Sequence, residues 1–267
     1  MNNSFKFIFS AALTLSLVLF IAACGKEDAA SPSSGRLRFF HAVADAPTAG
    51  MELVLNGKSL SFRNYLTPGT ILTDSTFKYG LPFPNNTGTA LDSNYLYLTE
   101  GSHNVKINAP VGTTTSVLTQ DVAISAGKNY TGFVIDSLAK MGLLVVEDVL
   151  PATKTGKAFV RVAHLSPNAP TVDVMLRYVK TTSGVVAYPD SVSIAKGVAY
   201  KGVSSFVEVK APDSLQVEFR TAGTLTSTVT FPKSALIAGR CYTILARGFV
   251  GKASPQNLTT SSIIHGR

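Results

Sequence analysis

The sequence has no tryptophan, only two cysteines and a charged fraction of only 15%. Beyond the N-terminal apolar segment, it has no long stretch in which apolar residues recur at helical spacing. Thr, Ser, Val, Gly and Ala are abundant, and this composition with so few charges favours strands over helices. We therefore predict an all-β protein.

The chain also lacks basic runs, although its formal net charge is +8. Such a charge could indicate a nucleic acid or another anionic partner. The lysines and arginines are scattered singly along the chain, however. We therefore expect no nucleic-acid partner, whereas attraction to anionic glycans or lipid headgroups stays open.

Short catalytic signatures are absent as well. The chain contains no G-x-S-x-G, G-x-x-x-x-G-K-[ST], G-x-G-x-x-G or H-E-x-x-H motif. We therefore predict no catalytic residue, no metal site and no cofactor. An enzyme is not excluded, because a pair of catalytic carboxylates leaves little local signature.

Residues 1–23 have the three parts of an export signal. Lys6 is the only charge, an uncharged apolar run follows, and the run ends in small residues. A transmembrane helix is the alternative interpretation. The run from Phe7 to Ala23 is near the lower limit of about 17–25 residues that crossing a bilayer requires.

The end of this segment, Ile21-Ala22-Ala23-Cys24, resembles a lipobox. The thiol of Cys24 would carry diacylglycerol as a thioether, and cleavage before Cys24 would free an amino group for a further chain such as palmitate. Two or more chains on one residue give stable anchoring to a membrane. Residues 24–35 would then be the lipidated cysteine and a flexible tether.

The tether begins with Lys26, Glu27 and Asp28, which resemble the lipoprotein export signal of one large Gram-negative phylum. That signal sends lipoproteins to the outer face of the outer membrane, so we expect a lipid-anchored protein that faces the cell exterior. A charged, solvated tether is the alternative. With Cys24 lipidated, Cys241 has no partner cysteine in the chain, and its strand-like surroundings predict a buried thiol.

An internal repeat sets the domain organisation. The segment Arg38-Phe39-Phe40-His41-Ala42-Val43-Ala44-Asp45-Ala46-Pro47-Thr48 aligns without gaps with Arg161-Val162-Ala163-His164-Leu165-Ser166-Pro167-Asn168-Ala169-Pro170-Thr171. A second match joins residues 126–131 to residues 238–243. The first copy carries extra residues around 80–88, which we interpret as a loop insertion because turn formers dominate there.

Each copy contains many short alternating runs that Gly, Pro, Asn or Asp separate, as in a sandwich or barrel. The predicted fold is therefore two tandem immunoglobulin-like antiparallel β-sandwich domains after a cleaved lipoprotein signal peptide. We place the first module at residues 36–150, as a divergent copy with an insertion, and the second at residues 156–267.

The second copy resembles the family of the domain of unknown function 4397 over its motif R-V-x-H-x-S-P-x-A-P-x-V-D-V. Its matching residues are Arg161, Val162, His164, Ser166, Pro167, Ala169, Pro170, Val172, Asp173 and Val174, and later Tyr200, Val203, Phe206, Val207, Gly239, Tyr242 and Thr243. The first copy diverges, with Val43-Ala44 where the family has Ser-Pro. This resemblance implies a bacterial cell-envelope protein and no established activity.

The repeated segment is the clearest candidate site. Its residues are His41, Asp45 and Pro47 in the first copy and His164, Asn168 and Pro170 in the second. With Asp45 and Asp173, the two histidines could bind a metal or move a proton. We favour a structural turn, because Asp or Asn bonds the backbone two residues on and Pro presets φ.

Aromatic residues offer a second candidate. Tyr95, Tyr97, Tyr130, Tyr200 and Tyr242 could stack on sugars, but their strand-like spacing favours packing inside the sheets. The insertion also carries Tyr79, Phe83, Asn85, Asn86 and Asp92, and loops on a rigid sandwich often bind ligands. Surface variation is the alternative for the insertion.

Four Asp-Ser pairs resemble the O-glycosylation acceptor motif of the same phylum. The acceptors would be Ser75, Ser137, Ser191 and Ser214. Ordinary Asp-Ser turns would give the same pattern, and the sequence does not separate the two interpretations.

These observations lead to competing functional hypotheses. The first is a non-catalytic surface lipoprotein that binds, adheres or acts as a structural module, with a glycan or a protein as its ligand. The second is an envelope enzyme, or an accessory subunit of one, that acts on glycans. The third is a scaffold that faces the periplasm.

Overall fold

The computed structural model describes residues 33–47, 50–60, 82–83, 95–182, 185–211 and 214–265. Residues Ser34–Arg267 cluster into one compact unit. The predicted signal peptide, Cys24 and the tether up to residue 32 lie outside the described residues. Among the residues that are described, no helix is long and apolar enough to cross a membrane.

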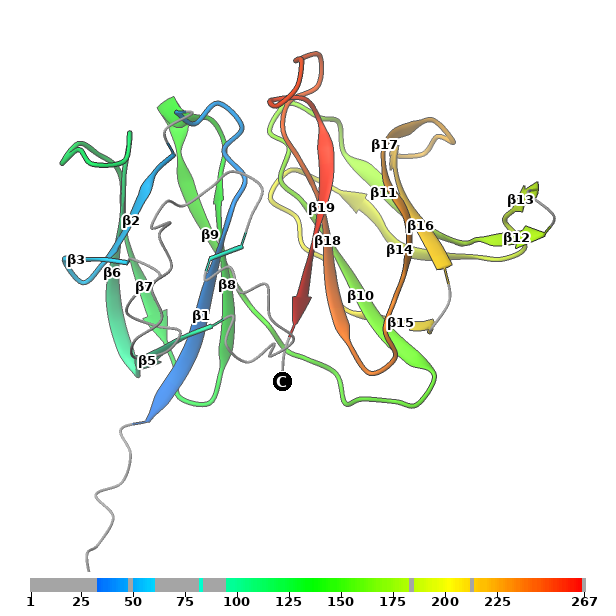
Figure 1. Ribbon diagram of the computed structural model, residues 1–267, viewed down its shortest axis with the longest axis horizontal. Coiled ribbons are helices and arrows are strands. Elements are labelled where there is room, and N and C mark those ends of the chain that lie inside the picture. Colours follow the sequence, from blue (N-terminus) through cyan, green and yellow to red (C-terminus); the bar gives the residue numbers. More distant parts are fainter. Residues whose placement is uncertain are drawn as a thin grey trace, which may run out of the picture. The chain divides into compact units, whose positions relative to one another are not determined.

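The first module is a sandwich of two sheets (Figure 1). One sheet has the order β4-β1-β8-β9, with β5 also paired to β1, and the other has the order β3-β2-β6-β7. The elements are β1 (Ser34–His41), β2 (Glu52–Leu55), β3 (Lys58–Ser59), β4 (Pro82–Phe83), β5 (Leu96–Thr99), β6 (Gly101–Asn108), β7 (Ser116–Ile124), β8 (Asn129–Ile135), the short 3-10 turn η3 (Leu138–Lys140) and β9 (Gly142–Glu147).

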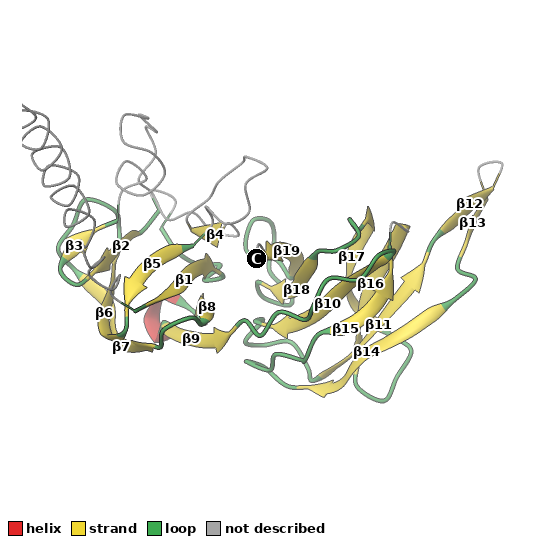
Figure 2. Cartoon of the chain, turned by 90° about the horizontal axis from the view of Figure 1, so that it is seen from below, coloured by secondary structure: helices red, strands yellow, loops and turns green. Residues whose placement is uncertain are grey.

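The second module repeats this arrangement, with sheets β15-β10-β18-β19 and β14-β11-β16-β17. Its strands are β10 (Lys157–His164), β11 (Val172–Tyr178), β12 (Lys180–Thr182), β13 (Val185–Ala187), β14 (Ser191–Val198), β15 (Val207–Lys210), β16 (Ser214–Thr221), β17 (Ser227–Ala235), β18 (Cys241–Arg247) and β19 (Thr259–His265). Strands β12 and β13 form a separate two-stranded hairpin that extends beyond the four-stranded sheets of the module (Figure 2).

The prediction of an all-β protein with two tandem sandwiches is confirmed. The sheets differ from a purely antiparallel arrangement in one respect. In each module, the first strand pairs in parallel with the penultimate strand, β1 with β8 and β10 with β18. Arg38 lies opposite Thr131 in the first pair and Arg161 lies opposite Thr243 in the second, so the sequence repeat is also a repeat of register.

A tyrosine closes the same corner of both sandwiches. The hydroxyl of Tyr130 accepts a hydrogen bond from the backbone N–H of Ser125 at 3.4 Å, and that of Tyr242 accepts one from Ile237 at 2.9 Å. Such a bond from an early residue of the penultimate strand back to the preceding corner is typical of immunoglobulin-like sandwiches. Both tyrosines are largely buried, so the sequence-based preference for packing over a sugar platform fits their positions.

Within the described residues, three apolar cores hold the unit together. The first lies between the sheets of the first module and includes Leu37, Phe39 and Ile107. The second lies between the sheets of the second module. The third joins residues of both modules, namely Phe40, Ala42, Phe133, Ile135, Ala163, Leu165, Leu245 and Ile263.

This third core explains the composition of β1, β8, β10 and β18. Along β1, Leu37 and Phe39 belong to the first core and Phe40 to the shared core. Along β18, Ile244 faces the second core and Leu245 the shared core. Strands that are buried on both faces have nearly continuous apolar sequences instead of alternating ones. The two sandwiches therefore meet through one sheet of each.

Candidate functional site

Two arginines occupy equivalent positions where the modules meet. Arg38 on β1 and Arg161 on β10 are 1% and 3% exposed, although each lies in an apolar strand. Their neighbours in sequence point into the sandwich cores, so the arginine side chains point toward the other module. Because a buried guanidinium is costly without partners, its contacts define the chemistry of this region.

Each arginine binds the end of the last strand of the other module. Arg38 donates Nη1–H to the carbonyl oxygen of Ile264 at 2.9 Å and contacts Nδ1 of His265 through Nη2. Arg161 donates Nη1–H to the carbonyl oxygen of Glu147 at 3.3 Å and bonds the carboxylate of Asp148 through Nη2. Because the arginine of each module makes the same contacts to the other module, the two modules are related by an approximate two-fold axis.

A threonine and an aromatic ring complete each half of this cluster. Nε of Arg38 donates to Oγ1 of Thr131 at 3.1 Å, and Nε of Arg161 donates to Oγ1 of Thr243 at 2.8 Å. The guanidinium carbon of Arg38 lies 4.7 Å from the ring centre of Tyr95, and that of Arg161 lies 4.8 Å from Phe206. We call Arg38, Asp148, Arg161 and His265, with these four neighbours, the buried arginine cluster.

The carboxylate of Asp148 is the hub of the cluster. Its Oδ2 accepts hydrogen bonds from Thr131 at 2.7 Å and from the hydroxyl of Tyr95 at 3.1 Å, and it lies 4.0 Å from Arg38 Nη2. Burial alone would raise the pKa of Asp148, but the charges of Arg38 and Arg161 hold it well below its usual range. Asp148 is therefore ionised.

The equivalent position in the second module, at the end of β19, holds His265 instead of a carboxylate. Burial and the neighbouring charge of Arg38 lower the pKa of His265 to about 3, so its ring is neutral at physiological pH. With Nδ1 accepting from Arg38, Nε2 carries the proton and donates to Oγ1 of Thr243 at 2.7 Å. The cluster thus buries two guanidinium charges against one carboxylate.

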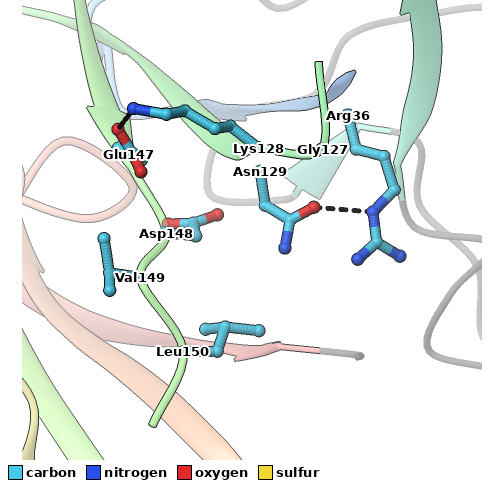
Figure 3. Close-up of a pocket in the computed structure, with 8 residues that line it drawn as sticks. All are labelled: Arg36, Gly127, Lys128, Asn129, Glu147, Asp148, Val149 and Leu150. Atoms are coloured by element: carbon cyan, nitrogen blue, oxygen red, sulfur yellow. Dashed lines mark hydrogen bonds and ion pairs between the residues drawn. The ribbon is translucent and has the colours of Figure 1, made fainter. Parts of the chain in front are cut away.

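A pocket opens beside this cluster, where the chain leaves the first module (Figure 3). It has a volume of about 310 Å³, and we call it the junction pocket. Its lining residues are Arg36, Gly127, Lys128, Asn129, Glu147, Asp148, Val149 and Leu150. Asp148 belongs both to the lining of the pocket and to the buried arginine cluster.

The polar side chains of the junction pocket are held in place. Nε of Arg36 donates to Oδ1 of Asn129 at 2.6 Å, and Nζ of Lys128 donates to Oε2 of Glu147 at 2.8 Å (Figure 3). The bond to Glu147 raises the pKa of Lys128. Val149 and Leu150 add an apolar side to the pocket (Figure 3).

The repeated histidines lie at strand ends and bond the loops that follow. Nδ1 of His41 accepts from the N–H of Val43 at 3.2 Å. Nδ1 of His164 accepts from the N–H of Ser166 at 3.4 Å, and its Nε2 lies 3.0 Å from the carbonyl oxygen of Pro170. Desolvation by burial lowers the pKa of both rings, to about 3 for His41.

The neighbouring Asp45 and Asn168 bind a different loop. Oδ1 of Asp45 accepts from the N–H of Leu138, and Oδ1 of Asn168 accepts from the N–H of Val250, both at 2.8 Å. We expected these side chains to bond the backbone two residues on. In the structure they tie the loop after the first strand to the loop after the penultimate strand. Pro47 and Pro170 lie in the same loops.

The remaining predicted site residues are dispersed. Ser137 and Ser214 are partly buried and Ser191 is exposed, whereas Ser75, Cys24, Lys26, Glu27 and Asp28 lie outside the described residues. Cys241 is a buried thiol on β18. Tyr95 is buried in the cluster and Tyr97 is 62% exposed. Within the described ranges, no group of His, Cys, Asp or Glu is arranged to hold a metal ion.

Sequence reasoning missed the role of the two arginines. Both were visible in the repeat, and an arginine that recurs in the middle of an apolar strand signals a buried polar contact. Their partners Asp148 and His265 occupy equivalent positions in the two modules. Because they are different residue types, the internal repeat does not reveal them.

Comparison with known families gives one match. The profile of the domain of unknown function DUF4397 matches residues 35–175, which span the first module and the start of the second through most of β11. The chain belongs to the DUF4397 family. No curated protein matches the sequence. The DUF4397 match includes Arg38, Asp148 and Arg161 of the buried arginine cluster.

Solved structures resemble the DUF4397 chain only distantly. A leucine-rich repeat protein from Bacteroides thetaiotaomicron is 12% identical, and the alignment covers 86% of this chain and 27% of that one, with a TM-score of 0.20. The Bacillus anthracis TIE protein is 11% identical, with 80% and 34% covered and a TM-score of 0.22. The chain thus spans about a third or less of these two proteins.

A proposed cell adhesion protein from Bacteroides ovatus is 11% identical. Its alignment covers 88% of this chain and 98% of that one, with a TM-score of 0.27. At such TM-scores the likeness carries no information on function.

Proposed function

We propose that this DUF4397 chain is a lipid-anchored protein of the cell envelope whose two modules form a non-catalytic binding or adhesive unit outside the outer membrane. The lipobox-like Ile21-Ala22-Ala23-Cys24 carries the proposal, because its cysteine is placed for lipidation directly after an export-like segment. The tether that follows would let the folded unit stand away from the bilayer.

The architecture of the folded unit supports a binding role over a catalytic one. A glycan-cleaving enzyme needs two carboxylates that face each other across a cleft. In the junction pocket, Glu147 is ion-paired with Lys128, and Asp148 is bonded by Arg161. Both carboxylates thus already have cationic partners within the chain, and the shared core between the modules makes a continuous body that suits a rigid spacer or binding platform.

Lipid attachment is tested by metabolic labelling of cells with a radioactive or alkyne-bearing palmitate. The wild-type chain should incorporate the label, and Cys24→Ala should incorporate none and lose its membrane association. Cys241→Ala is the matched control, because it removes the other cysteine and should label like the wild type. Equal labelling of Cys24→Ala and the wild type would contradict the anchor.

Orientation is tested by adding a protease to intact cells. The wild-type chain should be cut, whereas a variant with Lys26, Glu27 and Asp28 all changed to Ala should be protected until the cells are lysed. If both proteins resist until lysis, the chain faces the periplasm and the surface role is wrong. A role in the periplasm, with envelope components as partners, would replace it.

A further inference from the structure

Strands β1 and β10 start at the same end of the folded unit. Arg38 and Arg161, each the fifth residue of its strand, both lie against Asp148. Phe40 and Ala163, two residues further along these strands, both belong to the shared core. The two strands therefore run in the same direction. Figure 1 shows the start of β1, the turn before β18 and the end of β19 at this end, which we call the entry end.

The proposed lipid anchor joins the folded unit at the entry end. Cys24 lies ten positions before Ser34, the first residue of β1. A chain of ten residues spans at most about 33–36 Å, even when it is fully extended. With Cys24 lipidated, the entry end therefore stays within this distance of the bilayer. Because the tether keeps the two close together, even a weak contact between them is favoured over separation.

Three large apolar side chains are exposed at the entry end. Tyr97 on β5 is 62% exposed, and its register partner is Arg36, near the start of β1. Val149 is 70% exposed and follows β9, whose last residues pair with the first residues of β8. Ile237 is 59% exposed in the turn before β18. Apolar side chains exposed together at one end of a folded unit indicate contact with an apolar partner.

The charged side chains of the entry end are compatible with an anionic membrane surface. Lys154 and Lys157 share the single carboxylate of Glu208, at 2.5 and 3.1 Å. Outside the buried arginine cluster, the described strand ends, turns and linker at this end carry six basic side chains and four acidic ones. They are Arg36, Lys128, Lys154, Lys157, Lys210 and Arg240 against Glu100, Glu147, Asp190 and Glu208. The excess is positive, so anionic headgroups attract this end.

We propose that the entry end docks on the bilayer that holds the lipid of Cys24. Tyr97, Val149 and Ile237 then lie at the level of the headgroups, where a tyrosine ring with an apolar body and a polar tip is well suited. This inference rests on the proposed lipid anchor and adds an orientation that a tether alone does not set. The loops at the opposite end, after β16 and β18, point away from the membrane and are left for partners.

Tryptophan fluorescence tests this docking directly, because the chain contains no tryptophan of its own. The full chain, purified with its lipid, is reconstituted into vesicles of phosphatidylglycerol and phosphatidylcholine whose acyl chains carry bromine as a quencher. Ile237→Trp and Tyr97→Trp should each lose about half of their fluorescence relative to bromine-free vesicles, since an interfacial side chain reaches about 5–10 Å into the headgroup boundary.

The variant Leu225→Trp is the matched control for the reporter. Leu225 is 85% exposed in the turn between β16 and β17, at the end opposite to the entry end. It offers a tryptophan the same freedom to reach a membrane, and its fluorescence should be nearly unchanged by bromine. This control separates docking of the entry end from the general attraction of an indole ring to the interface.

A second set of variants tests whether the apolar side chains hold the entry end on the bilayer. With Tyr97→Trp as the reporter, Val149→Asp and Ile237→Asp together should reduce the quenching about twofold or more, because a carboxylate enters the bilayer at a cost. Leu225→Asp should leave it unchanged. All three positions are exposed, so the thermal unfolding curves of these variants should match that of the wild type.

Three results would overturn the inference. They are no quenching of either entry-end reporter while the chain stays bound to the vesicles, equal quenching at Leu225→Trp and Ile237→Trp, or quenching that the two aspartates leave unchanged. A chain that carries no lipid and does not bind the vesicles would overturn the anchor as well as the docking. Palmitate labelling of the wild type and of Cys24→Ala identifies that case separately.

Discussion

The two modules share strand order, register and the central arginine, yet they differ at the residue that faces it. The last strand of the first module is followed by Asp148, and the last strand of the second ends with the neutral His265. If two copies of the second module met through this sheet, they would bury two arginines without any carboxylate, at a high cost in stability. The second module therefore prefers the first module over a copy of itself, and the tandem is a matched pair.

Exchange of the two facing residues is the strongest test of this matched pair. Asp148→His should remove the only carboxylate of the cluster and lower the free energy of unfolding by about 3–5 kcal/mol, because two buried guanidiniums then lack a counter-charge. Adding His265→Asp restores one carboxylate at the equivalent position and should recover most of the loss. Chemical denaturation of the wild type, both single variants and the double variant measures the coupling.

The single variant His265→Asp serves as the control for that cycle. It balances the two arginines with two carboxylates and should be no less stable than the double variant. If the double variant is as unstable as Asp148→His alone, the two positions are not equivalent, and the approximate two-fold relation between the modules is wrong.

The shared core should matter as much as the cores inside the sandwiches. Leu245→Ala in the shared core and its neighbour Ile244→Ala in the second core both remove a fully buried side chain. Each should lower the free energy of unfolding by about 2–4 kcal/mol through lost burial and a new cavity. A loss below about 1 kcal/mol for Leu245→Ala alone would show that the modules do not depend on each other.

Acid should weaken the cluster. The unfolded chain protonates histidine near pH 6.5, but folded His265 does so only near pH 3, so the unfolded state binds more protons between these values. Stability should therefore fall as pH drops through this window, by about 1.4 kcal/mol per pH unit from His265. The variant His265→Gln should show a flatter dependence of the free energy of unfolding on pH. If its slope between pH 6 and pH 4 equals that of the wild type, the ring of His265 is not buried in its neutral form.

The corner tyrosines give the smallest expected difference between the modules. Tyr242→Phe removes a backbone hydrogen bond of 2.9 Å and should cost about 1 kcal/mol, whereas Tyr130→Phe removes a longer one of 3.4 Å and should cost less. Thermal unfolding of both variants measures this order. Equal or reversed losses would show that the hydroxyl bonds do not distinguish the corners.

Much of the fold could be predicted because its signals are local. Alternation, turn residues and the gapless repeat around His41 and His164 are all visible along the chain, and together they lead to two β-sandwiches. The parallel pairing of β1 with β8 was not predicted. It joins segments 93 residues apart, as the Arg38–Thr131 bond shows, and no local pattern records such a pairing.

The site was much harder to predict than the fold. The shared core depends on which face of β1 meets which face of β18, and a strand buried on both sides has no alternation to reveal this. Asp148 falls at the end of the first module, where it looks like a linker residue. The histidine motif attracted attention because it repeats, whereas the lining of the junction pocket includes residues that differ between the copies, such as Arg36 and Asn129.

Scanning calorimetry of the purified chain tests most directly whether the two modules form one cooperative unit. Because the modules share an apolar core and the buried arginine cluster, the account predicts a single unfolding transition whose calorimetric and van't Hoff enthalpies agree. Two separate transitions, with Asp148→His shifting neither or only one of them, would contradict it and show two independent domains on one tether.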